Sequence, residues 1–231
     1  MGNYLIIGGS SGIGKAIREQ LHSQGHTVYA TFFKNDSMKS DSNFHYLNVL
    51  SETPDLDFLP DTLDGFAYCP GAIDLKPFHR ISEEAIMEDF NLQVLGAVRI
   101  LKLILPKLKA SGKGSVVFFS TVAVQTGFPF HAQVSISKGA IEGLARSLAA
   151  ELAPTIRVNV IAPSLTHTPL AEKLLSSPEK IELNGQRHPM KRIGTPEDLA
   201  EASCFLLSDK SSWITGQIIH VDGGMSSLKI G

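Results

Sequence analysis

Short apolar runs alternate with longer amphipathic stretches along the whole chain. The short runs have the length of strands and are apolar throughout rather than alternating, which is typical of parallel strands covered on both faces. The predicted strands are Tyr4–Ile7, Thr27–Phe32, Phe44–Leu47, Gly65–Tyr68, Ser115–Ser120, Arg157–Ile161 and Ile218–Val221. The clearest predicted helices are Ile13–Gln24, Glu83–Leu105, Val134–Leu152 and Pro196–Leu207.

This order of elements predicts one α/β domain over residues 1–231. Strand–helix–strand units join parallel strands by right-handed crossovers, so we expect a doubly wound, Rossmann-type sheet of seven parallel strands with helices on both faces. Thr195–Asp198 marks a helix start, with an N-cap, a proline and two acids. The loops Asp41–Phe44 and Leu56–Leu63 are too short to leave room for full crossover helices.

Composition and charge exclude several classes of function. The chain has 21 Lys and Arg against 23 Asp and Glu, so no basic surplus favours a nucleic-acid or membrane partner. No apolar run reaches the ~18 residues that span a bilayer. Cys69 and Cys204 are too few for a disulfide framework, and we expect a cytoplasmic protein. The eight histidines lack metal-ligand spacing, so no metal site is expected.

A glycine-rich segment joins the first strand to the first long helix. It reads Gly8-Gly9-Ser10-Ser11-Gly12-Ile13-Gly14. Gly8 allows a tight turn, Gly12 lets the backbone approach a pyrophosphate, and Gly14 lets helix and strand pack closely. The free N–H groups of the helix start face the anion. Because this segment follows a strand and opens a helix, it predicts dinucleotide binding.

The G-x-x-x-G-x-G spacing resembles the short-chain dehydrogenase/reductase family, and the resemblance runs nearly end to end. Ile156–Ser164 is similar to the family's I-R-V-N-x-x-x-P-G segment, with Ser164 in place of glycine. Gly194–Asp198 and Ile214–Gly224 are similar to its C-terminal signature. The family's N-N-A-G segment is here Tyr68-Cys69-Pro70-Gly71, which keeps only the glycine. The resemblance implies an NAD(P)-binding oxidoreductase that acts on a small molecule.

The end of the second predicted strand indicates the cofactor. An acid at that position binds the ribose 2′-OH of NAD and repels the 2′-phosphate of NADP. This chain has Phe32 there, with Lys34 close behind, and Ser10 and Ser11 can donate hydrogen bonds. NADP(H) is therefore favoured, although Lys34 can also be read as a solvated loop lysine.

The resemblance implies three further cofactor contacts. Asn48 takes the position where the family has an Asp near the adenine. Gly71 is the retained glycine after the fourth strand, and Thr168 matches the residue that bonds the nicotinamide carboxamide.

The family's catalytic tetrad is only partly present. In relatives a Tyr protonates the carbonyl oxygen, a Lys four residues later lowers its pKa and holds the nicotinamide ribose, a Ser orients the substrate, and an Asn holds a water relay. Lys138 matches the lysine, and Val134 stands at the tyrosine position. Thr121 and Gln93 stand at the serine and asparagine positions, while Asn91 is two residues off and faces away.

Two candidates can replace the missing proton donor. His131 lies seven residues before Lys138, where the enoyl-reductase branch of the family places its tyrosine, and imidazole can act as an acid near neutral pH. His131 can also be read as a loop histidine that touches solvent. Alternatively, Thr121 and Lys138 hold a water in the vacated space.

Two functions remain open on these grounds. The first is an NADP(H)-dependent oxidoreductase that acts on a small carbonyl or a conjugated enone. The second is a catalytically silent NADP-binding partner or sensor. The resemblance also implies a homodimer or homotetramer that pairs through Glu83–Leu105 and Val134–Leu152.

Overall fold

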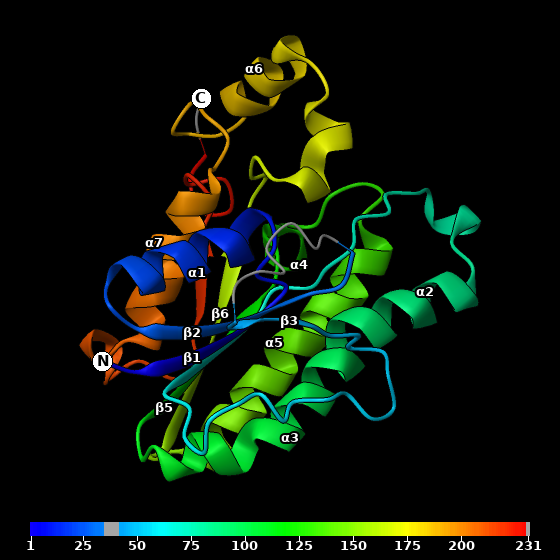
Figure 1. Cartoon of the computed structure of the whole chain (residues 1–231). Coiled ribbons are helices and arrows are strands. Elements are labelled where there is room, and N and C mark those ends of the chain that lie inside the picture. The colour runs from blue at the N-terminus through cyan, green and yellow to red at the C-terminus, as the bar shows by residue number, and fades with distance from the viewer. Residues whose placement is uncertain (35–41, 230–231) are drawn as a thin grey trace.

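A computed structural model describes residues 1–34 and 42–229 and contains one sheet of seven strands (Figure 1). All neighbouring pairs are parallel, in the order β3-β2-β1-β4-β5-β6-β7. The strands are β1 (Asn3–Ile7), β2 (Thr27–Phe32), β3 (Phe44–Tyr46), β4 (Gly65–Tyr68), β5 (Gly114–Phe119), β6 (Ile156–Pro163) and β7 (Ile218–Val221). The predicted doubly wound parallel sheet is confirmed.

Helices cover both faces of this sheet (Figure 1). The helices are α1 (Gly12–Ser23), α2 (Glu83–Phe90), α3 (Gly96–Ala110), α4 (Val122–Thr126), α5 (Ala132–Leu152), α6 (Pro178–Gln186) and α7 (Pro196–Leu207). On one face, α1 and α7 pack together over a core that includes Ile6, Ile17 and Leu199. On the other face, α3 and α5 cover a larger core that includes Phe66 and Phe118. The central strands β1, β4, β5 and β6 are thus largely buried on both sides, whereas the edge strands β3 and β7 are partly exposed.

The predicted helix Glu83–Leu105 requires a correction. The chain instead forms α2, a π-helical turn at Asn91–Leu95, and α3, which continues past Pro106 to Ala110. The proline is tolerated because it lies on the exposed side of α3, where water can satisfy the carbonyl that loses its partner. The fully buried Leu108 anchors the last turn.

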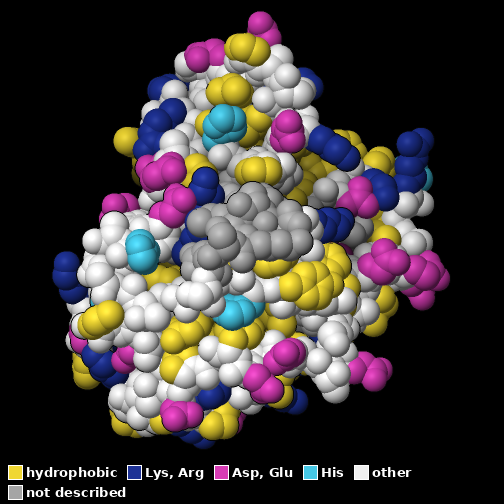
Figure 2. All heavy atoms as spheres, viewed as in Figure 1, with side chains coloured by type: hydrophobic (Ala, Val, Ile, Leu, Met, Phe, Trp, Pro, Cys, Tyr) yellow, Lys and Arg dark blue, Asp and Glu magenta, His cyan; other side chains and the backbone are white. Residues whose placement is uncertain are grey.

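The connection from β3 to β4 lacks a full crossover helix, as predicted. Residues 47–64 contain no helix, so β3 is joined to β4 by turns alone. Asp41, in the other short loop, lies outside the described residues. Basic and acidic side chains are interspersed over the face drawn in Figure 2. Within the described parts of the chain, no helix is long and apolar enough to cross a membrane.

Between β6 and α7 the chain leaves the sheet. We call residues 164–194 the excursion. It contains a 3₁₀ helix (Pro169–Leu175) and α6, which stand above the sheet in Figure 1. A parallel bridge between Thr166 and Gly194 closes its base, and its own small core includes Leu175 and Ile193. The excursion therefore covers the carboxyl ends of the central strands.

Candidate active site

The glycine-rich segment forms the turn from β1 into α1. Gly8 and Gly12 have φ of 79° and 52°, in the left-handed region that favours glycine. A Cβ on Gly14 would overlap the carbonyl oxygen of Gly8, so helix and turn approach each other more closely than a side chain permits. Ser11 is the N-cap of α1, and its side chain makes no capping bond. The first N–H groups of α1 therefore lack partners within the helix and can receive an anion.

A cavity of about 360 Å³ lies beside this turn, at the carboxyl ends of β4, β5 and β6. In open α/β sheets, ligands bind at this edge, where the strand order reverses. The predicted residues that line the cavity are Ile13, Gly71, Gln93, Thr121, His131, Lys138 and Thr168. All four predicted catalytic residues thus face one space, together with the nicotinamide end of the predicted cofactor set.

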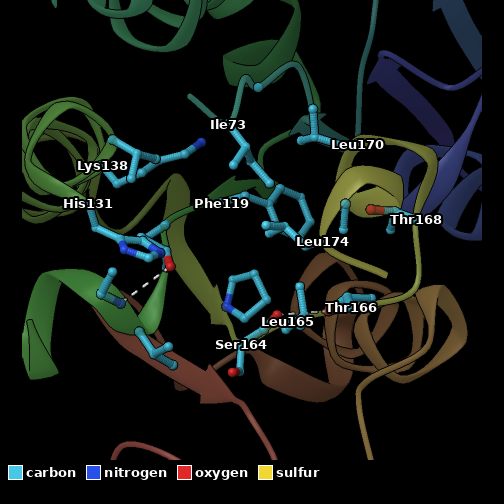
Figure 3. A pocket seen from close by; sticks show the side chains of 18 of the residues that line it. Ile73, Phe119, His131, Lys138, Ser164, Leu165, Thr166, Thr168, Leu170 and Leu174 are labelled. Carbon is cyan, nitrogen blue, oxygen red and sulfur yellow. Dashed lines mark hydrogen bonds between the residues drawn. The ribbon is translucent and has the colours of Figure 1, made fainter. Parts of the chain in front are cut away.

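Lys138 reaches into this cavity from α5 (Figure 3). A Cβ on Gly71 would lie 3.9 Å from Lys138 Nζ and 3.4 Å from Gln93 Oε1, so both polar atoms face the bare backbone of Gly71. Loss of hydration lowers the pKa of Lys138 to about 8, against the opposing effects of Asp89 and Cys69. The same cause raises the pKa of Cys69 to about 12, so this thiol stays protonated.

Gln93 belongs to a buried polar network that sequence reasoning missed. Its Nε2 donates to Asp89 Oδ1 over 2.7 Å, and Ser137 Oγ donates to Asp89 Oδ2 over 2.5 Å. Asp89 is 5% exposed, and each of its two carboxyl oxygens accepts one of these bonds. This fixes the amide of Gln93, whose Oε1 is buried and has no protein partner. The signal was the i, i+4 spacing of Asp89 and Gln93.

No tyrosine takes the place of Val134. Val134 is buried, lines the cavity and lies one helical turn before Lys138 on α5. None of the four tyrosines lines the cavity. The nearest in sequence to the site, Tyr68, donates its hydroxyl to the carbonyl of Leu92 over 2.6 Å. A Cβ on Gly96 would overlap this hydroxyl, so Tyr68 packs directly against the backbone at the start of α3.

His131 and Thr121 lie at helix starts on the cavity wall. His131 is the N-cap of α5, and its Nδ1 lies 2.8 Å from the carbonyl oxygen of Pro129. Because a carbonyl oxygen only accepts, Nδ1 carries a proton, and Nε2 is the nitrogen left for another partner. Thr121 is the N-cap of α4, and its Oγ1 accepts from Ala123 N over 3.3 Å.

The adenine half of the predicted cofactor set lies outside this cavity. Phe32 is buried and stacks on Phe44 with ring centroids 5.0 Å apart, so it offers a neutral surface at the end of β2. Lys34 follows it on the surface. The side chain of Asn48 accepts from Leu50 N over 3.0 Å. At the other end, a Cβ on Gly12 would lie 3.4 Å from Thr168, so the excursion touches the glycine-rich turn.

Comparisons with known proteins show the family of this chain. A family profile described as "Enoyl-(Acyl carrier protein) reductase" matches residues 56–226. The chain is 32% identical to the 3-oxoacyl-(acyl-carrier-protein) reductase FabG of Thermotoga maritima, over 96% of this chain and 96% of the relative. The chain belongs to the short-chain dehydrogenase/reductase family.

Solved structures of this family superpose closely. A short chain dehydrogenase family protein from Francisella tularensis has a TM-score of 0.89 at 30% identity, covering 99% of this chain and 100% of that one. The structure of ElxO with NADP bound has a TM-score of 0.89 at 25% identity, with the same coverage. As a member of the short-chain dehydrogenase/reductase family, the chain is an oxidoreductase.

The site also holds a pair that departs from the family pattern and whose contact sequence reasoning missed. Ser164 replaces the family's glycine and lies 2.8 Å from Nε2 of His188. Both residues line the cavity, but they are 24 positions apart, and only the turn of the excursion brings them together.

Proposed function

We propose that this chain is an NADP(H)-dependent reductase of a small carbonyl or a conjugated enone. The observation that carries the proposal is the convergence of Lys138, Gln93 and Thr121 on one cavity beside the glycine-rich turn. The cavity of about 360 Å³ also extends beyond the predicted cofactor residues to Leu165, Leu174 and His188, as a site for a second molecule requires.

The residues fit a nicotinamide dinucleotide. Bare backbone at Gly12 and Gly71 faces Thr168 and Lys138, and the orphan Oε1 of Gln93 points to the same space. The α1 N–H groups would hold the pyrophosphate, Lys138 the nicotinamide ribose, and Thr168 the carboxamide. When bound, the cofactor supplies a hydride.

NADP(H) is proposed over NAD(H) because the end of β2 carries no acid. Phe32 cannot repel a 2′-phosphate, and the exposed Lys34 can pair with it. One charge-assisted hydrogen bond contributes roughly 1.5–3 kcal/mol. Fluorescence titration should give NADPH a several-fold lower dissociation constant than NADH. Lys34→Ala should reduce the difference between the NADPH and NADH dissociation constants. The control is Lys113→Ala, which should leave this difference unchanged, because Lys113 lies next to β5 and pairs with Asp209. Equal constants in the unmodified protein would overturn the choice.

The missing tyrosine favours an enone over a simple ketone. Reduction of a ketone requires a proton at the developing alkoxide, whereas an enone can be protonated at carbon in a later step. His131 holds one proton on Nδ1 against Pro129, and a second proton on Nε2 makes it a donor to the cavity. We propose that His131 or a water between Thr121 and Lys138 delivers this proton. The enoyl-reductase description of the matching profile supports the same substrate class.

A rate comparison tests the proposal. NADPH consumption should be measured with cyclohexenone and cyclohexanone at saturating NADPH, and we expect turnover of the enone above that of the ketone. NADPH binding without turnover of any carbonyl or enone would favour a silent NADP-binding partner instead.

Assembly and location extend the proposal. The apolar side chains of Leu103 on α3 and Ile136 on α5 are 49% and 44% exposed. We propose that they contribute to a homodimer or homotetramer, as the family resemblance implies. Both cysteines are free thiols, which supports a cytoplasmic location.

A further inference from the structure

The cavity has a second polar end that the proposed reaction does not use. Ser164, His188 and Arg187 line it, on the end of β6 and just after α6. In Figure 3, Phe119 and Leu174 occupy the middle of the view, with Lys138 on one side and Ser164 below. The two polar ends are therefore separated by an apolar stretch.

Hydrogen bonds fix the side chains of His188 and Ser164 at this second end. His188 is 3% exposed, and its Nδ1 lies 2.9 Å from the carbonyl oxygen of Asn184. Because that oxygen only accepts, Nδ1 carries a proton, and Nε2 meets Ser164 Oγ over 2.8 Å. With a second proton on Nε2, the imidazolium donates to Ser164 and frees the serine hydroxyl to donate into the cavity.

The charge of the lining has one sign. Its ionisable side chains include Lys138, His131, Arg187 and His188, and none of the residues that line it is an Asp or Glu. Arg187 forms no ion pair with a described acidic residue, whereas nearby Arg192 is paired with Asp198 over 2.6 Å. Lys138 faces the proposed ribose position, so Arg187 is the cation left for a substrate.

We propose that the substrate carries a carboxylate, which Arg187 and the hydroxyl of Ser164 bind at this end while its carbonyl or enone faces Lys138 and Thr121. The inference rests on the proposed function. A guanidinium and a hydroxyl suit a planar carboxylate, because the fork of an arginine can donate to both oxygens. His188 acts as a positioning residue, since it reaches the substrate only through Ser164.

A matched pair of substrates tests this inference. With NADPH as reductant, β-acetylacrylate carries an enone and a carboxylate, and its methyl ester replaces the charged oxygen with a neutral methoxy group. We expect KM for the acid to be about tenfold or more below that of the ester, as one charge-assisted contact predicts. Arg187→Gln should remove this preference by raising KM for the acid with kcat retained. Ser164→Ala should raise the same KM several-fold. Lys180→Gln, which removes a charge from α6 outside the cavity, should change neither.

A binding experiment separates this inference from the proposed function. Calorimetry on the NADPH-saturated protein compares valerate with valeramide, neither of which can react. Absence of turnover with both the acid and the ester would contradict the reductase proposal. The anion site would still be supported if valerate bound more tightly than valeramide and Arg187→Gln abolished this difference in affinity. If acid and ester have equal KM, or valerate and valeramide bind equally, the anion site is wrong.

Discussion

The surroundings of Lys138, one of the predicted catalytic residues, lower its pKa. Its ammonium group lies in a mostly apolar cavity, and Asp89, the charge that most favours the ammonium form, also accepts hydrogen bonds from Gln93 and Ser137. The pKa falls from 10.5 to about 8, so the lysine changes charge within an accessible pH range. A charged lysine donates hydrogen bonds below this pKa and loses one donor and its charge above it.

NADPH affinity should therefore decline as pH rises above about 8. Lys138→Arg should hold its affinity level through the same range, because a guanidinium stays protonated. Fluorescence titration of NADPH at several pH values measures both curves. The same decline in the Lys138→Arg variant would assign the effect to another group.

Val134 defines the second prediction at this scale. Val134→Tyr places a phenol one helical turn before Lys138, whose charge lowers the phenol pKa. Ketone reduction should rise by a sizeable part of the ~10²–10⁴-fold that a general acid contributes. Steady-state rates on cyclohexanone and cyclohexenone measure the change.

His131→Gln provides the comparison for Val134→Tyr. If His131 donates the proton, this variant should lower the enone rate while NADPH binding is retained. A large ketone gain in Val134→Tyr with no effect of His131→Gln would remove the proposed role of His131.

The site residues divide by how far apart they lie in sequence. Lys138, Val134 and Thr121 could be located from the sequence because fixed spacings on neighbouring elements set them. Gln93 could be aligned, but its orientation depends on Asp89, which only the packing of α2 against α5 reveals. Ser164 could be aligned with the family's glycine, but its contact with His188 had no local signal, since an irregular turn brings the two residues together.

At the scale of elements, hydrogen bonds join α2, the π-helical turn and α5 on the side of the cavity that carries Gln93 and Lys138. Asp89 on α2 accepts from Gln93 in the turn and from Ser137 on α5. Periodicity predicted one continuous helix here, because a single π-helical turn shifts the spacing of apolar residues by only one position. Within this turn the carbonyl of Leu92 accepts from the Tyr68 hydroxyl, a contact that no local pattern encodes.

Asp89→Asn should alter this junction in a specific way. Removing the carboxylate removes a charge that raises the pKa of Lys138, so the decline in NADPH affinity should move to lower pH. One of the two donors also loses its acceptor, so unfolding should require about 1–3 kcal/mol less free energy.

The pH titration of NADPH, repeated on this variant, provides the measurement for Asp89→Asn. Glu88→Gln, the exposed neighbour on α2, serves as the control and should leave the profile in place. Lower stability with an unmoved pH profile would reduce Asp89 to a structural role.

At the scale of the whole molecule, the outer surfaces of α3 and α5 carry the assembly prediction. Light scattering at micromolar concentration should give the mass of a dimer or tetramer. Leu103→Glu combined with Ile136→Glu should shift it toward the monomer, because buried unpaired charges oppose association. Leu183→Glu, on the exposed surface of α6, is the control. A monomeric mass for the unmodified chain would contradict the assembly.

The excursion has a consequence for how this chain can diverge. Its base is closed by the bridge between Thr166 and Gly194, and its small core is separate from the two cores of the sheet. Substitutions and length changes between these two residues, apart from the proposed cofactor contact Thr168, can accumulate without disturbing the strands or α5, which carries Lys138. In the proposed function, the excursion contributes to substrate selectivity, whereas other segments of the sequence form the sheet and its cores. Replacing the excursion alone can therefore change the substrate while the fold is kept.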